Sequence, residues 1–248
     1  MAGHSKFKNI MHRKGAQDAK RAKKFARLTK ELQVAARDGV DPSSNPRLRS
    51  ALAACRAVNM PKDNIERVIK KAESGENSNL EDIRYEGYAP GGVALIVDAV
   101  TDNRNRTAAE VRSAFAKFGG NLAETGSVSF MFSNLGYIVF KNDVKSDEEI
   151  MEIAIDVGAD DVNSDENTHE IITSIAEFNN VREKLEELLG PPEQAELIWQ
   201  PENYIQIDDE QKATSILKLI DTLDNCDDVQ GVYGNFEINQ DTLSAIEV

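Results

Sequence analysis

The residues of this chain whose types and spacing could do chemistry are cations near its N-terminus. Between residues 17 and 37 they recur every three or four positions, at Lys20, Lys23, Lys24, Arg27 and Lys30. At 100° per residue these side chains share one face of a helix, opposite an apolar face. Such a row of cations can bind the phosphate groups of a nucleic acid.

A second set of cations precedes this predicted helix, in a polar and weakly periodic segment. Its members are Lys6, Lys8, His12, Arg13 and Lys14. We expect a flexible arm that adds phosphate contacts beside the helix. Phe7, in the same segment, could stack on a base or pack against the helices.

A third basic site is predicted at residues 101–107, where Arg104 and Arg106 precede a helix expected over 107–118. Thr107 and Glu110 have the spacing of a capping box at its start. Two interpretations stay open for the arginines. They could pair with Asp102 and Glu110, or they could form an anion site with the amides of the helix end.

The charge of the chain changes sign along its length. Residues 1–75 contain 18 lysines and arginines against 7 aspartates and glutamates, although the whole chain has a net charge of −14. A polyanionic partner would therefore contact one end of the chain and be repelled by the rest. Any such contact should be oriented.

The basic end is predicted to form a three-helix bundle. Gly39 ends the first helix, Asn45 caps the second, which starts at Pro46, and Pro61 starts the third. The turn at residues 58–61 has the length of a helix-turn-helix turn but lacks its usual glycine. Because the strongest basic face is on the first helix, base reading by the third helix is the less favoured alternative.

The acidic remainder alternates short strands and helices. Residues 135–200 follow the order β-α-β-β-α-β, with helices at 146–157 and 178–189, and the flanking segments suggest a second such unit. Strands are also expected at 93–100, 126–132, 203–208 and 229–236, and a helix at 210–223. The predicted class is α+β. The predicted domains are a basic helical domain at 1–76, a discontinuous ferredoxin-like domain at 77–133 and 201–248, and a second ferredoxin-like domain inserted at 134–200.

Enzymatic motifs are missing from the sequence. It has no HExxH, GxSxG or Walker motif, and the glycine-rich segment 85–92 lacks the following lysine of a phosphate-binding loop. We read that segment as a turn. His4 and His12 have no supporting ligands nearby, so no metal is predicted. The sequence therefore predicts no enzyme and no cofactor.

Location is suggested by what the sequence does not contain. No apolar run is long enough to span a bilayer, and no apolar segment follows the basic start as in a secretory signal. Cys55 and Cys226 are far apart, which fits reduced thiols in a reducing compartment. We expect a cytoplasmic protein, with a mitochondrial transit peptide as the minor alternative.

Several sequence blocks resemble the YebC family. They are Gly3–Lys6, His12–Lys14, Gln17–Arg21, Tyr85–Tyr88, Thr101–Thr107 and Gly119–Leu122. The resemblance implies three domains, with two α/β domains around an acidic cavity, and a cytoplasmic, non-enzymatic protein. Phe7 and Phe130 stand where the family usually has tryptophan, and Ala89 replaces a frequent glycine.

The resemblance favours a DNA-binding transcriptional regulator, which is how family members are usually described. The alternative is a ribosome-associated translation factor that relieves stalling in proline-rich stretches, as the resemblance implies for some relatives. A third hypothesis is an adaptor that binds proteins through its acidic domains. The expected partner is DNA or ribosomal RNA, together with ribosomal proteins at the acidic domains, and neither a membrane nor a small-molecule substrate. Phosphate contacts dominate binding to both nucleic acids, so the residues alone do not separate them.

Overall fold

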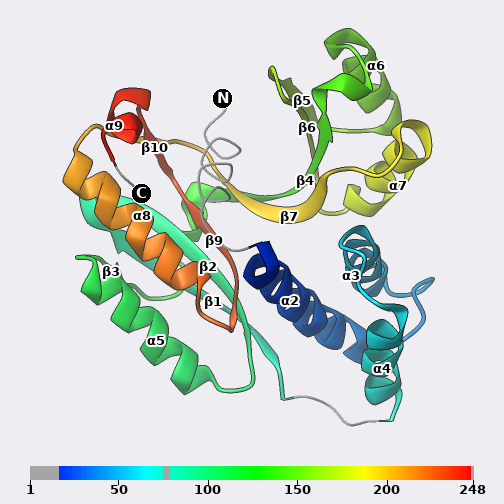
Figure 1. Ribbon diagram of the computed structural model, residues 1–248, viewed down its shortest axis with the longest axis horizontal. Helices are drawn as coiled ribbons and strands as arrows, with labels where there is room; N and C mark the ends of the chain where they lie inside the picture. The colour runs from blue at the N-terminus through cyan, green and yellow to red at the C-terminus, as the bar shows by residue number, and fades with distance from the viewer. Residues whose placement is uncertain (1–16, 75–78, 247–248) are drawn as a thin grey trace. The chain divides into compact units, whose positions relative to one another are not determined.

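The computed structural model describes residues 17–74 and 79–246, and side chains from residue 22 onward (Figure 1). The chain divides into two compact units, a smaller one at residues 133–200 and a larger one formed by the segments on either side. Helices are combined with mainly antiparallel sheets, which confirms the predicted α+β class. Within the described residues no helix is both long and apolar enough to cross a membrane.

The larger unit begins with three helices, α2 (Gln17–Arg37), α3 (Pro46–Ala57) and α4 (Lys62–Glu73), which we call the helical domain. Asn45 fixes the start of α3, since its side chain accepts a hydrogen bond from Leu48 N at 2.9 Å. The same side chain donates to the carbonyl oxygens of Ala35 and Gly39, both at 2.7 Å. One asparagine therefore caps α3 and ties it to the end of α2.

α3 and α4 each pack mainly against α2, and their apolar faces form one core. That core consists of Leu32, Ala35, Ala36, Leu48, Ala51, Leu52, Cys55, Met60 and Val68. Burial raises the pKa of the Cys55 thiol to about 11, so this thiol stays protonated at neutral pH. Pro61 is the cap of α4 rather than its first residue.

The larger unit continues as a sheet domain. Its elements are β1 (Glu81–Ala89), β2 (Val93–Thr101), α5 (Arg104–Lys117), β3 (Asn121–Leu122), β8 (Ile205–Ile207), α8 (Glu210–Asp224), β9 (Val229–Gly234), β10 (Phe236–Ile238) and α9 (Gln240–Ala245). The main sheet has the order β3-β1-β2-β9. α5 and α8 lie side by side on one face of it, where Leu95 and Val97 meet Phe115 and Ile216 (Figure 1).

Strand β1 is the main element that the sequence did not predict. It pairs with β2 along nine residues, from Glu81 opposite Thr101 to Ala89 opposite Val93. The glycines that suggested a turn have two different roles. Gly91 has a φ of 80° in the connection, whereas Gly87 lies within the strand, where an added Cβ would be 2.7 Å from Phe115 Cε1.

Two predicted strands are also corrected. The strand expected at 203–208 is the short β8, which pairs in parallel with β10 outside the main sheet, and β1 occupies the place beside β2 instead. The strand expected at 126–132 is a loop with a 3₁₀ turn, η2 (Ser129–Met131), because its backbone amides bond to a side chain rather than to a neighbouring strand.

That side chain is Glu86, which is buried at 2% exposure. Its carboxylate accepts hydrogen bonds from Gly126 N at 2.9 Å, Val128 N at 2.7 Å and Ser129 N at 3.0 Å. Burial by itself would raise the pKa of this carboxyl, but the three amides outweigh burial and hold its pKa below the usual value. A buried charge thus fixes the loop that presents Phe130, which is 69% exposed.

The smaller unit is built from β4 (Phe132–Lys141), α6 (Asp147–Val157), β5 (Asp161–Ser164), β6 (Thr168–Thr173), α7 (Phe178–Leu189) and β7 (Gln194–Pro201). The β-α-β-β-α-β order predicted from the sequence is the one observed, with sheet order β5-β6-β4-β7. Ser146 and Glu149 form a capping box at the start of α6. The chain leaves and re-enters the larger unit at adjacent points, where Glu202 N donates to Met131 O at 3.0 Å.

Replacing Glu86 with glutamine tests whether its charge holds the loop. The Glu86→Gln variant loses charge-assisted hydrogen bonds worth about 2 kcal/mol, so amide hydrogen exchange over residues 123–131 should become about thirty-fold faster. Exchange is measured by mass spectrometry. Glu124→Gln changes an exposed carboxylate in the same loop and should leave exchange unchanged. Equal acceleration in both variants would contradict this role of Glu86.

Candidate nucleic-acid interface

The structure places the predicted contact residues in different settings. Five of them, Lys6, Lys8, His12, Arg13 and Lys14, lie outside the described residues, as does the side chain of Lys20. The others are Lys23, Lys24, Arg27, Lys30, Arg104 and Arg106, and all belong to the larger unit.

Two cations of α2 bind the last residue of α8. Lys23 Nζ lies 2.7 Å from Asp224 Oδ2, and an Arg27 guanidinium nitrogen lies 2.8 Å from Asp224 Oδ1 and 2.8 Å from its carbonyl oxygen. Burial would raise the pKa of Asp224, but the two cations outweigh burial and lower it. This part of the basic face therefore meets an internal anion rather than open solvent.

A third paired cation of α2, Lys30, binds the turn between α8 and β9. Its Nζ is 2.7 Å from Asp228 Oδ1 and 2.8 Å from the carbonyl oxygen of Asp227. The other oxygen of Asp228 accepts bonds from an Arg106 nitrogen at 2.7 Å and from two hydroxyls, those of Thr101 at 2.9 Å and Thr107 at 2.8 Å. The Asp228 side chain is 6% exposed.

This environment lowers the pKa of the Asp228 carboxyl. Burial disfavours the carboxylate, but the hydrogen bonds from Arg106, Lys30 and the two threonines outweigh it and hold the pKa well below the usual range. Arg106 also pairs with Asp102 at 2.9 Å, and its own pKa is raised, first by the hydrogen bond to Asp228. The Asp228 carboxylate and the Arg106 guanidinium therefore stay charged at neutral pH.

The two arginines of the 101–107 segment have different surroundings. Arg106 is paired, with Asp102 as expected and with Asp228 in addition, while Arg104 is 70% exposed and 3.7 Å from Glu81. The predicted capping box is wrong. The cap is Asn103, four residues earlier, whose side chain accepts a hydrogen bond from Arg106 N at 3.1 Å. Thr107 lies inside α5, which begins at Arg104.

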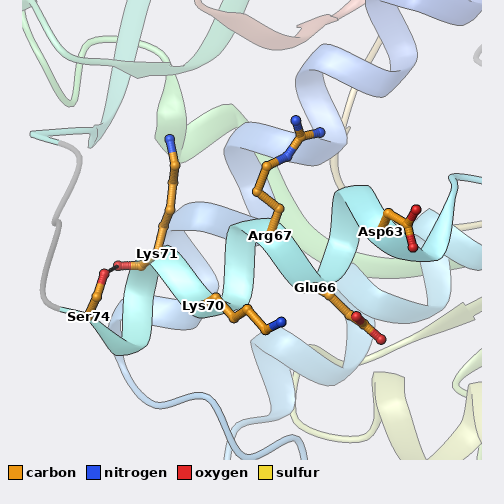
Figure 2. A pocket seen from close by; sticks show the side chains of 6 residues that line it. All are labelled: Asp63, Glu66, Arg67, Lys70, Lys71 and Ser74. Carbon is orange, nitrogen blue, oxygen red and sulfur yellow. Dashed lines mark hydrogen bonds between the residues drawn. The ribbon is translucent and has the colours of Figure 1, made fainter.

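The exposed cations of the helical domain lie elsewhere. Lys24 is exposed on α2, and Arg67, Lys70 and Lys71 are exposed on α4. An open hollow of about 480 Å³ runs along α4, lined by Asp63, Glu66, Arg67, Lys70, Lys71 and Ser74 (Figure 2). Within the described part of the chain, Lys24, Lys70 and Lys71 take part in no ion pair.

The lining of this hollow is mixed in charge and cationic in balance. Figure 2 shows Arg67 and Lys71 projecting from the same side of α4, with Lys70 and Glu66 on another side. Arg67 donates to the side-chain oxygen of Asn64, and Lys62 is 3.5 Å from Glu66. Two lysines in the last turn also suit the negative end of the helix dipole.

The α4 cations were not among the residues predicted to contact nucleic acid. Their signal in the sequence was the separation of Ile65, Val68 and Ile69 from charged neighbours on one short helix. The denser row of cations on α2 led to the prediction of a phosphate-binding face there instead. Nothing in the spacing of that row indicates acidic partners some 200 residues away.

Two family models match the chain. The TACO1/YebC protein N-terminal domain matches residues 5–75, and the TACO1/YebC second and third domain matches residues 80–236. The chain belongs to the TACO1/YebC family. This confirms the resemblance seen in the sequence blocks. The two matches meet at residues 75–80, where the basic helical domain gives way to the acidic remainder.

A solved structure agrees with the TACO1/YebC assignment. The crystal structure of a conserved hypothetical protein from Aquifex aeolicus is 48% identical to this chain and superposes with a TM-score of 0.83. The match covers 90% of this chain and 93% of that one. TACO1/YebC is a regulatory family.

Within the described residues, no group of three or more histidine, cysteine, aspartate or glutamate side chains is arranged to hold a metal ion.

An Asp228→Asn variant tests the internal anion. It leaves Lys30 and Arg106 without their carboxylate, so the free energy of unfolding should fall by about 2 kcal/mol at neutral pH. Because the folded-state pKa is lowered, the stabilisation is present above the unfolded pKa of about 4 and is lost as pH falls through the folded value. The deficit of the variant should therefore shrink in acid. Urea unfolding, followed at NMR signals of α5, measures it.

The matched control is Asp227→Asn, which makes the same charge change at the exposed neighbour. Its effect should stay within about 0.5 kcal/mol. A deficit at Asp228 that is independent of pH would contradict a role for its charge.

Proposed function

We propose that this chain is a non-enzymatic, cytoplasmic regulatory protein of the YebC type that binds nucleic acid through its helical domain, as a DNA-binding regulator of transcription. The observation that supports this most directly is the exposed cationic stretch Arg67, Lys70 and Lys71 on α4. Unlike Lys23, Arg27 and Lys30 of α2, these side chains are turned to solvent, in a domain whose sequence is strongly basic.

The chemistry of α4 suits contact with phosphates. Lysines on flexible stems act as point charges toward phosphate oxygens, and Arg67 can form paired hydrogen bonds to one phosphate. Asp63 and Glu66 on the same helix would repel a backbone that lay across its first turns. A bound strand should therefore approach the C-terminal half of α4. Such contacts position a protein on nucleic acid without reading sequence.

A second candidate function is binding to the ribosome as a translation factor. Its specific support is the smaller unit, where residues 133–200 contain 17 acidic and 4 basic side chains. An acidic surface of this kind complements basic ribosomal proteins, while the helical domain could bind ribosomal RNA through backbone and shape. α3 and α4 each pack mainly on α2, so their contacts add no specific support for a helix-turn-helix that reads bases.

Charge reversal on α4 tests the nucleic-acid binding that both functions require. We expect the Lys70→Glu, Lys71→Glu double variant to bind a short DNA duplex or a short single-stranded RNA at least about ten-fold more weakly, with a salt slope smaller by about 2. Fluorescence anisotropy across a salt series measures both quantities. The control is Lys212→Glu, Lys218→Glu, two exposed lysines of α8 with the same charge change. Equal losses in the two variants would exclude α4 as the contact.

Ribosome co-sedimentation distinguishes the two functions. A transcription regulator should stay in the soluble fraction even at low salt and should be displaced from promoter DNA less easily by random duplex than by specific sequence. A translation factor should sediment with ribosomes in a salt-sensitive manner that the α4 double variant loses.

A further inference from the structure

The helical domain and the sheet domain have separate apolar cores. One is centred on Leu32 and Leu48 and the other on Leu95 and Phe115. An apolar cluster of three side chains, Val34, Leu80 and Val100, joins the two. So small an apolar contact contributes little of the docking free energy between the two domains.

Charged contacts also link the helical domain to the sheet domain. Lys23 and Arg27 reach Asp224, Lys30 reaches Asp228, and Arg47 of α3 lies 2.7 Å from Glu31 and 2.9 Å from Asp82 of β1. Arg37 donates to the carbonyl oxygen of Leu80. Most of these pairs are partly exposed. Their strength therefore depends on salt, and charged solutes can compete with them.

The anions of this interface resemble a stretch of nucleic-acid backbone in their chemistry. One carboxylate oxygen of Asp224 accepts a hydrogen bond from Lys23 and the other accepts one from Arg27. Asp228, four residues on, receives Lys30. Ammonium and guanidinium groups make the same charge-assisted bonds to phosphate oxygens. Three cations of the α2 face predicted to bind phosphate, Lys23, Arg27 and Lys30, are thus occupied by carboxylates of their own chain.

We propose that the turn Asp224–Asp228 competes with nucleic acid for this face of α2, so that phosphate binding there releases the helical domain from the sheet domain. This proposal rests on the proposed nucleic-acid binding and describes how the chain itself regulates that binding. The exposed cations Lys24, Lys70 and Lys71 make the first contacts. Lys23, Arg27 and Lys30 then exchange carboxylates for phosphates. Free and bound chains differ in domain arrangement, and random weak contacts with polyanions are suppressed by the cost of release.

Carboxyl footprinting on the intact protein tests the release directly. A carbodiimide with glycine ethyl ester labels accessible carboxylates, and mass spectrometry quantifies each site. Asp224 should be protected in the free protein relative to the exposed Asp227, which serves as an internal reference. High salt should raise labelling at Asp224, because it screens the pairs with Lys23 and Arg27.

The decisive samples contain a short DNA duplex or a short single-stranded RNA, with binding checked by anisotropy in the same solution. Labelling of Asp224 should rise several-fold on binding while that of Asp227 stays constant. Bound nucleic acid with Asp224 still protected would overturn the competition and leave the proposed function standing. A salt-released Asp224 without any binding would overturn the proposed function, and the competition with it.

A pair of variants gives an independent readout. Asp224→Asn removes the competitor, so affinity for either probe should increase about five-fold relative to Asp227→Asn, which changes the net charge equally. Equal affinities in the two variants would show that general charge, rather than occupation of the α2 face, controls binding. A decrease at Asp224→Asn would also overturn the proposal.

Discussion

The carboxylate of Asp228 is the interaction on which the arrangement of the larger unit depends. It joins the end of β2 through Thr101, the first turn of α5 through Arg106 and Thr107, and α2 through Lys30. A nearly buried charge is tolerated only while its partners remain, since an unpaired one costs several kcal/mol. The start of α5, the edge of the sheet and the position of the helical domain are therefore determined together.

Local signals in the sequence predicted the helices well. The Asn45–Pro46 pair located the start of α3, and the helix predicted over residues 178–189 has the bounds of α7. Strand β1 was missed because Gly87, Gly91 and Gly92 resemble a turn. Gly87 is needed instead for the close approach of β1 to Phe115. That reason lies in a contact made only after folding, so no local pattern reveals it.

The candidate site shows what a charge pattern does and does not determine. The row of cations on α2 predicted contact with phosphates, and in the structure Lys23, Arg27 and Lys30 of that row meet Asp224 and Asp228 of the same chain. The pairs span about 200 residues of sequence, beyond the reach of any spacing rule. On α4 a weaker row stays exposed. Charge density in the sequence does not distinguish cations that are paired within the chain from cations that remain exposed, and the tertiary structure does.

The hydrogen bond from Glu202 N to Met131 O has a consequence for how such a chain can change in evolution. The two crossings into the smaller unit are adjacent, so excising residues 133–200 would leave ends that a short linker could rejoin. The larger unit would keep its strand order, because β1, β2, β3 and β9 all lie outside the excised segment. The acidic smaller unit could therefore be replaced or lost in evolution without a change in the strand order of the unit that carries the cations.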